Sequence, residues 1–396
     1  MSTTLIVLIV ILLTLAALTG EDFIFKLLYM IAGVYLLGRF WSSRTAAAIR
    51  FNRHFTTRAF PKEEVRVQLA VSNPSVLPII WLRVQDLLPL EISPTRSFQQ
   101  VISLAPKETV RLNYLLKASK RGYYPVGPLR LTTGDILGLA QDEKIELTPD
   151  HLTVYPRVVP LRRLNLPSHS PMGTLKHHQP VYEDPTRPAG KRDYQQGDSL
   201  RRIDWKSSAV RGQLQVKQFE PSISLQIALV LNLNVNEYHY RKRIDATELA
   251  IVTAASVASW AITQKQSAGL ITNGMDPLGF DGQAQPLKIE KGRGHLMRLL
   301  EMMARVKIRE GEPLKNLIRE NRTRLAWGTT LVVITGQVDD ALFEEFFQAQ
   351  REGMDVAVII CGEYAEYQQV KQRARRYHIP VAQLWSEQDL EQWRGW

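Results

Sequence analysis

The residues with most potential for recognition or chemistry lie between Lys191 and Glu220, a segment that mixes arginines, lysines, acids and a tryptophan. Its pattern predicts a turn, a short strand, a second turn and a strand. Guanidinium groups pair with carboxylates in a bidentate manner and stack on aromatic rings. We interpret the segment as a structural clamp of Arg–carboxylate pairs stacked on a ring, with a ligand or partner surface as the alternative. The candidate residues are Arg192, Tyr194, Gly197, Asp198, Arg202, Asp204 and Trp205.

These residues form the motif R-x-Y-x-x-G-D-x-x-x-R-I-D-W-x-x-S-A, which runs from Arg192 to Ala209. The motif strongly resembles the signature of domain-of-unknown-function family 58, whose members are membrane-anchored bacterial and archaeal proteins often encoded beside MoxR-type AAA+ ATPases. Further matching pieces are Arg121-Gly122-Tyr123-Tyr124-x-x-Gly127-Pro128, Asp135-x-x-Gly138-Leu139 and Val154-Tyr155-Pro156. The resemblance covers most of the chain. It implies a MoxR-type ATPase as partner and implies no particular activity.

Strands and helices alternate over residues 222–396, which predicts a doubly wound α/β domain with right-handed crossovers. Asp245 is expected to cap the first helix, which ends near Gln264. The predicted strands are 225–233, 269–272, 330–335, 355–361 and 380–384, and the later helices are 295–306, 313–322, 340–352 and 363–377.

This half of the chain resembles a von Willebrand factor A domain, which the family usually carries after the signature. Such domains often bind a divalent ion through an Asp-x-Ser-x-Ser turn after the first strand, with a Thr and an Asp from later loops. The matching residues here are Asn232, Asn234, Asn236 and Thr335. Hard cations prefer carboxylates, so we expect a degenerate site and no cofactor. Weak cation binding, rescue by Asp339 or Asp340, and a neutral platform for a partner peptide stay open.

The N-terminal residues 1–42 predict a transmembrane helical hairpin. Residues 3–19 carry no charge, residues 23–41 carry only Lys26 and Arg39, and a tight turn joins the two segments. Each segment is close to the length of the hydrocarbon core at about 1.5 Å per residue. A cleaved signal peptide is the alternative for the first segment. Basic residues dominate after the hairpin, so the positive-inside rule places both termini in the cytoplasm and the chain in the inner membrane.

Two further regions precede the α/β half. Short alternating strands over residues 60–160 predict a β-sandwich, which we interpret as an adaptor or spacer. Residues 161–221 form an irregular, proline-rich connector that leads into the signature. His177 and His178 lie in this connector without acids or cysteines at ligand spacing, so a metal site is not expected there.

The composition excludes several classes of protein. The single cysteine, Cys361, excludes an intrachain disulfide, and no phosphate-binding loop, zinc-protease motif or nucleophile elbow is present. The formal charge is +11, from 50 basic and 39 acidic residues, which favours an anionic neighbour. We therefore predict a non-catalytic membrane-anchored scaffold. The alternatives are a cryptic hydrolase or peptidase using Ser208 or Cys361, and a basic nucleic-acid-binding membrane protein, which the acids among the arginines disfavour.

Overall fold

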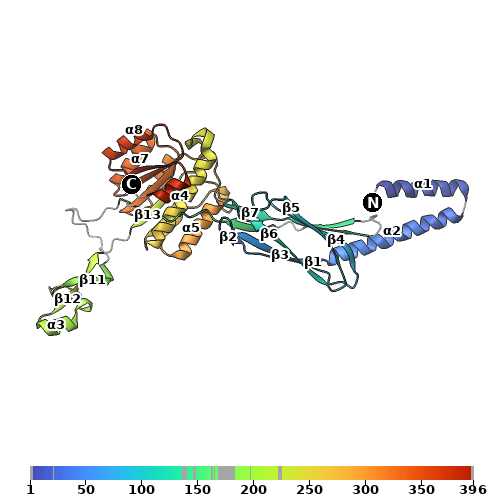
Figure 1. Cartoon of the computed structure of the whole chain (residues 1–396), viewed down its shortest axis with the longest axis horizontal. Helices are drawn as coiled ribbons and strands as arrows, with labels where there is room; N and C mark the ends of the chain where they lie inside the picture. The colour runs from blue at the N-terminus through green and yellow to red at the C-terminus, as the bar shows by residue number, and fades with distance from the viewer. Residues whose placement is uncertain are drawn as a thin grey trace. The chain divides into compact units, whose positions relative to one another are not determined.

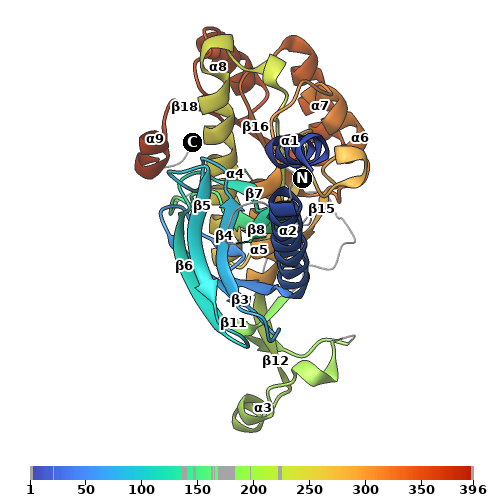
Figure 2. The same cartoon turned by 90° about the vertical axis from the view of Figure 1, so that its right-hand side faces the viewer.

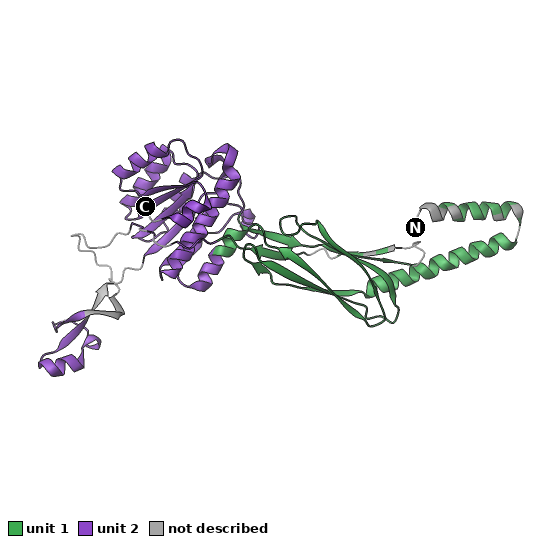
Figure 3. Cartoon of the chain, in the orientation of Figure 1, with its two compact units in different colours: residues 1–157, 300–306 green, residues 158–299, 307–396 purple. Residues whose placement is uncertain are grey.

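The computed structural model describes residues 3–20, 22–135, 141–145, 149–161, 164, 166–167, 183–196, 198–221 and 225–393 of the chain. It divides into two compact units (Figure 3). The first contains Met1–Arg157 and Leu300–Val306, and the second contains Val158–Leu299 and Lys307–Trp396. Gly138, Leu139, His177, His178 and Gly197, which the sequence analysis singled out, lie outside the described residues.

The first unit begins with two apolar helices, α1 (Thr3–Thr19) and α2 (Asp22–Ala48), which contact each other. Within the described residues, two helical stretches are long and apolar enough to cross a membrane, α2 and Tyr240–Thr263. The apolar part of the second stretch is 78% buried, so it is a core helix, whereas that of α2 is 0% buried. α2 continues to Ala48, beyond the predicted boundary at residue 42, and runs beside β8 (Leu129–Gly134) (Figure 2).

The rest of the first unit consists of three small sheets. Sheet order is β1-β3-β6 in the first, β5-β4-β8-β9 in the second and β2-β10-β7 in the third. The remaining strands are β1 (Arg50–His54), β2 (Arg58–Ala59), β3 (Glu64–Ser72), β4 (Ile79–Leu87), β5 (Ser97–Leu104), β6 (Thr109–Lys117), β7 (Gly122–Val126), β9 (Gln141–Ile145) and β10 (Asp150–Val154). The strands therefore start at Arg50, ten residues before the predicted boundary at 60.

The β1-β3-β6 sheet packs against both of the other sheets, and the alternation of β3 explains how. Its inward side chains Val65, Val67, Leu69 and Val71 are all at most 3% exposed. Leu69 and Val71 lie in a core cluster with β4 and β8, while Val65 and Val67 lie in a second cluster with β7 and β10. Burial of alternate residues on facing sheets is the packing that the sequence predicted for this region.

The second unit contains a six-stranded sheet with the order β15-β14-β13-β16-β17-β18. All neighbouring pairs are parallel except β14 with β15 at the edge. The first three strands, β13 to β15, form one half of the sheet, and β16 to β18 form the other. The topological switch point therefore lies where β13 and β16 are neighbours, at their carboxyl ends. The strands are β13 (Gln226–Leu231), β14 (Ser267–Thr272), β15 (Leu287–Glu290), β16 (Thr329–Thr335), β17 (Asp355–Cys361) and β18 (Val381–Leu384).

Helices cover both faces of this sheet (Figure 1). The longest, α4, contacts β13, β14, β16 and β17 on one face, whereas α6, α7 and α8 share a core cluster with alternate strand residues such as Val230 and Val333 on the other. The helices are α4 (Arg243–Thr263), α5 (Arg293–Arg305), α6 (Leu314–Arg322), α7 (Asp340–Arg351), α8 (Tyr367–Arg376) and α9 (Glu387–Gln392). The predicted alternation of strands and helices is confirmed. Asp245 lies in the first turn of α4 and is not its cap, which is Lys242.

Candidate functional site

The signature residues form a small module within the second unit. β11 (Glu183–Asp193) pairs with β12 (Gln215–Pro221) in antiparallel register, and the segment between them contains α3 (Trp205–Arg211). The prediction of turns and strands alone was wrong here, because Asp204 starts a helix at Trp205 by accepting the amide of Ser207 at 3.2 Å. Gly212 ends it in the left-handed conformation, with φ at 70°.

One predicted Arg–carboxylate pair is present in this module. Arg192 donates through both terminal nitrogens to Asp198, at 2.7 Å each, and the Gln195 amide donates to the same carboxylate at 2.9 Å. Hydrogen bonds from Arg192 and from the Gln195 backbone lower the pKa of Asp198. The pair therefore links the end of β11 to Asp198 in the segment that follows it.

A second ion pair joins the end of β11 to the N-terminus of α3. Lys191 Nζ lies 2.8 Å from Asp204 Oδ2 and also donates to the Ser207 hydroxyl. The Lys191 hydrogen bond and the Ser207 backbone amide lower the pKa of Asp204 to about 2. Ser208 is 8% exposed, and its hydroxyl donates to the Asp204 carbonyl and accepts the Gln215 amide, each at 2.8 Å. That hydroxyl links α3 to β12.

The aromatic part of the clamp differs from the prediction. Trp205 is 68% exposed at the start of α3 and does not lie under the Arg192–Asp198 pair as a buried platform would. Tyr194 is half-buried and pairs through its backbone amide with Leu214, and Arg202 is exposed. Apolar side chains on the module are exposed as well: Leu200 at 66%, Val210 at 83% and Leu214 at 43%.

The predicted degenerate ion site lies at the switch point of the sheet, directly after β13 and β16. Asn232 and Thr335 are both fully buried, and the Asn232 amide donates to the Thr335 hydroxyl at 2.9 Å. The same amide donates to Glu237 Oε2 at 2.6 Å, while the Asn232 oxygen accepts from Asn273 at 2.9 Å and from the Asn234 backbone at 3.0 Å. The place where a cation would need oxygen ligands is therefore filled by an amide N–H₂ group with two acceptors.

The Asn234 side chain forms hydrogen bonds with backbone groups. Asn234 accepts the Asn236 amide at 3.2 Å and donates to the Gly311 carbonyl at 3.1 Å. Asn236 itself is exposed. Within the part of the chain that the structure describes, no group of three His, Cys, Asp or Glu side chains is arranged to hold a metal. The polar groups of Asn232 and Asn234 are thus used in hydrogen bonds within the protein.

Among the residues that the structure describes, Glu237 is the acid that hydrogen-bonds to this network, and the sequence analysis missed it. Besides Asn232, its carboxylate accepts the Leu314 amide at the start of α6, at 3.2 Å from each oxygen. Burial raises the pKa of Glu237, and the hydrogen bonds from Asn232 and Leu314 oppose that rise. A carboxylate five residues after Asn232 was the available signal, but the turn that brings it back is not visible in the sequence.

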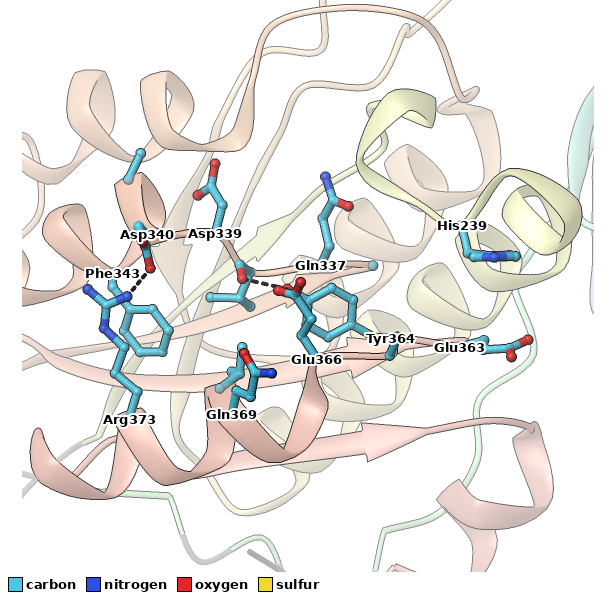
Figure 4. Close-up of a pocket in the computed structure, with 15 residues that line it drawn as sticks. His239, Gln337, Asp339, Asp340, Phe343, Glu363, Tyr364, Glu366, Gln369 and Arg373 are labelled. Carbon is cyan, nitrogen blue, oxygen red and sulfur yellow. Dashed lines mark hydrogen bonds and ion pairs between the residues drawn. The ribbon is translucent and has the colours of Figure 1, made fainter.

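A hollow of about 900 Å³ lies nearby, at the carboxyl ends of β16 and β17 (Figure 4). Its rim carries Asp339, Asp340, Glu363 and Glu366. These acids already have partners: Asp339 caps α7 at Leu342, Asp340 pairs with Arg373, Glu363 lies 3.7 Å from Lys242, and Glu366 accepts from Tyr364 at 3.4 Å. Asp340 begins α7, as predicted, and does not complete the site at Asn232.

Two further buried features lie outside these sites, one at Cys361 and one at Arg53 and Asp86. Cys361 is 1% exposed at the end of β17, and burial raises the pKa of its thiol to about 12, so it is a poor nucleophile. In the sandwich, Arg53 and Asp86 form a bidentate pair at 3.0 and 2.9 Å, and the Tyr114 hydroxyl donates to Asp86 at 2.5 Å. No pattern along the chain predicts this network, because its members come from three separate strands.

Comparison with known proteins agrees in part with the resemblance seen in the sequence. Residues 190–366 match the family described as "Protein of unknown function DUF58". The chain is 25% identical over 313 residues to the uncharacterized protein YeaD of Bacillus subtilis. The matched region covers 78% of this chain and 74% of that protein.

Solved structures resemble only parts of the chain. Proximal thread matrix protein 1 of the mussel byssus has a TM-score of 0.32 and 11% identity, over 43% of this chain and 46% of its own. Native alpha-2-macroglobulin of Escherichia coli has a TM-score of 0.25 and 14% identity, over 30% of this chain and 20% of its own. Neither likeness carries an argument about function.

Proposed function

We propose that this protein is a non-catalytic, membrane-anchored adaptor whose signature module docks a protein partner. The observation that carries the proposal is the set of exposed apolar side chains on that module. Trp205 and Val210 are 68% and 83% exposed on α3, while Leu200 and Leu214, which flank the helix, are 66% and 43% exposed. Tryptophan and arginine dominate the energetics of protein interfaces, so a fixed, exposed tryptophan among basic residues suits docking.

The anchor is α2, with α1 beside it. No residue in the apolar part of α2 is buried, and this part is long enough to cross the hydrocarbon core, so it would need lipid around it. We further propose that α1 and α2 form a hairpin in the inner membrane, with the remainder of the chain in the cytoplasm, because basic residues follow α2.

A non-catalytic role is supported by how the polar groups are used. The Ser208 hydroxyl bridges two backbone groups, and the Cys361 thiol is buried with a raised pKa. The von Willebrand factor A-like switch point is occupied by an asparagine network in place of cation ligands. Each candidate for chemistry therefore has a structural partner.

The charge of the module indicates what the partner surface is like. Its exposed basic residues are Lys191, Arg201, Arg202, Lys206, Arg211 and Lys217. Such a surface favours an acidic partner, since complementary charge speeds and orients association. We propose a MoxR-type AAA+ ATPase, the partner that the family resemblance implies, in the assembly or activation of another protein complex.

The test is a pull-down from detergent-solubilised membranes with the full chain as bait, with and without nucleotide, followed by mass spectrometry. Trp205→Ala should weaken recovery of the AAA+ ATPase by about thirty-fold or more, the loss of roughly 2 kcal/mol that defines an interface hot spot. Trp385→Ala is the matched control, because Trp385 is also exposed, at 58%, and lies outside the module. If no AAA+ ATPase is recovered in either nucleotide state, the partner proposal fails.

A second variant separates the docking surface from the fold of the module. Asp198→Ala removes the acceptor of Arg192 and Gln195, so it should make the module more sensitive to trypsin. Trp205→Ala should leave that sensitivity unchanged. If both variants resist trypsin like the parent and both lose the partner, the Arg192–Asp198 pair belongs to the docking surface itself.

A further inference from the structure

The end of α2 is built into the sandwich of the first unit. Asp142 on β9 accepts Arg39 at 3.0 Å and Ser42 at 2.6 Å. Gly38 lies so close to Asp135 that a Cβ at this position would be 3.0 Å from the Asp135 Cβ. The helix and the sandwich therefore share one interface, and the depth of one in a membrane determines the depth of the other.

Trp41 marks the level at which α2 would leave the hydrocarbon. It is the last residue of the apolar segment, and its indole N–H donates to the carbonyl of Pro78 at 3.1 Å. Tryptophan is enriched at the membrane–water boundary, where its ring is apolar and its N–H finds a polar partner. This hydrogen bond places the loop from Asn73 to Pro78, between β3 and β4, at the same level.

The β3–β4 loop has a fixed conformation that presents an apolar side chain. Asn73 is fully buried and donates to the carbonyls of Leu77, at 2.8 Å, and Ala105, at 3.1 Å. The Asn73 oxygen accepts the hydroxyl of Ser75 at 2.6 Å. With the loop fixed from inside, Val76 at its tip is left 76% exposed.

The surroundings of this loop suit lipid headgroups. Phe40 is 62% exposed, and the guanidinium of Arg44 lies 5.8 Å from its ring centre. Arg50, which follows the helix, is exposed as well. Basic side chains just outside an apolar span are attracted to anionic lipids.

We infer that the β3–β4 loop is a second membrane contact, with Val76 seated in the headgroup layer beside α2. This inference rests on the proposed anchoring by α2. The loop would contact the surface of an anionic bilayer, because the hydrogen bond from Trp41 to Pro78 joins it to the membrane-spanning helix. The contact would hold the sandwich in one orientation against the membrane.

Site-directed fluorescence in vesicles tests the inference. The full chain carrying Val76→Cys is labelled with an environment-sensitive fluorophore and reconstituted into phosphatidylcholine–phosphatidylglycerol vesicles that contain nitroxide-bearing lipid. The native Cys361 is 1% exposed and is not expected to be labelled, which the parent chain checks. The nitroxide lipid should quench the label at Val76 at least twofold more strongly than a label at the control position.

Two reference positions make every outcome decisive. Leu90→Cys is the matched control, since Leu90 is 55% exposed beyond the far end of β4, whose nine residues span about 30 Å. Leu37→Cys reports on the span itself, because Leu37 is 71% exposed on α2. Quenching at Leu37 and Val76 but not at Leu90 supports the inference. Quenching at Leu37 alone, or equal quenching at Val76 and Leu90, overturns it while α2 remains an anchor. Absence of quenching at Leu37 would refute both the anchor and the inference.

Discussion

The side-chain amide of Asn232 donates to the carboxylate of Glu237 at 2.6 Å, at the switch point of the parallel sheet. An amide donor thus occupies the position in which a related site would need a negatively charged ligand. The Asn232 oxygen is equally committed, to Asn273 and to the backbone of Asn234. These partners satisfy every polar atom of the buried Asn232 side chain.

Replacing that donor with an acid should destabilise the fold unless a cation is supplied. Asn232→Asp would place two carboxylates within hydrogen-bonding distance in a buried site, which we expect to cost about 2 kcal/mol or more at neutral pH. Thermal unfolding with and without Mg²⁺ measures the effect, and Mg²⁺ should restore part of the loss. Asn236→Asp is the control, because Asn236 is exposed on the same turn. Equal melting of the two variants would contradict the prediction.

The pH dependence of this variant follows from the direction of the Glu237 shift. Burial already raises the pKa of Glu237 above its ordinary value of 4.5, so the folded chain holds this proton at pH values where the unfolded chain has released it. A group shifted upward in this way favours the folded state in acid and loses that contribution as pH rises through the folded pKa. In Asn232→Asp the second carboxylate raises the pKa of this buried pair further than in the parent, so the variant should regain stability relative to the parent as pH falls from 7 towards 5. Melting curves with an unchanged difference over this range would count against it.

The sandwich depends on the buried Arg53–Asp86 pair. The two side chains are 2% and 0% exposed, and Arg53 also donates to Asp150 at 2.7 Å, so removing the Asp86 charge leaves the buried guanidinium with Asp150 as its carboxylate partner. Asp86→Asn should cost about 1.5–3 kcal/mol, the usual contribution of hydrogen bonds to a charged group. Hydrogen exchange of peptides from β3 and β4 reports on this unit separately from the α/β unit. Arg83→Gln is the control, since Arg83 is exposed on the same strand, and it should exchange like the parent.

The N-terminus of α3 should stay folded as the pH falls from 5 to 3. Lys191 and the Ser207 amide lower the pKa of Asp204 to about 2 from an ordinary value of 3.8. A lowered pKa gives a stabilising contribution that is complete above the unfolded value and is lost as pH falls through the folded one. The ¹⁹F resonance of fluorotryptophan at Trp205, assigned with Trp205→Phe, should therefore not titrate between pH 5 and pH 3. A midpoint near 3.8 would show that Asp204 is not held by Lys191.

Cys361 should be inert in the native chain. Its thiol is 1% exposed and its pKa is raised to about 12 by burial, so the thiolate that reacts with alkylating reagents is absent at neutral pH. A maleimide should label the denatured chain and leave the folded chain unlabelled. Rapid labelling of the folded chain, with loss of signal after Cys361→Ser, would revive the hydrolase or peptidase alternative.

The sequence predicted those elements whose signals are local. Buried parallel strands are continuous apolar runs, so β17 was placed at its observed bounds of Asp355–Cys361. Arg–carboxylate pairs were predicted among the signature residues from their composition, without naming partners, and the structure shows one between Arg192 and Asp198. Both predictions concern residues that lie close together in the sequence.

The features that the sequence could not predict depend on contacts between distant segments. Arg53, Asp86 and Tyr114 come from β1, β4 and β6, and no pattern along the chain relates them. The helix at Trp205 was missed because seven residues are too few to show helical periodicity, and the Asp204 cap alone decides the conformation. Exposure of Trp205 was missed because an aromatic residue among arginines suggests stacking equally well.

The absence of any flexible joint after α2 has a mechanical consequence. The helix ends at Ala48, β1 begins at Arg50, and Asp142 holds the final turns of the helix to β9. Rotation of α2 about its own axis must therefore turn the sandwich by the same angle. Because each helical residue advances that angle by about 100°, the length of α2 itself selects which flank of the sandwich faces a neighbouring complex.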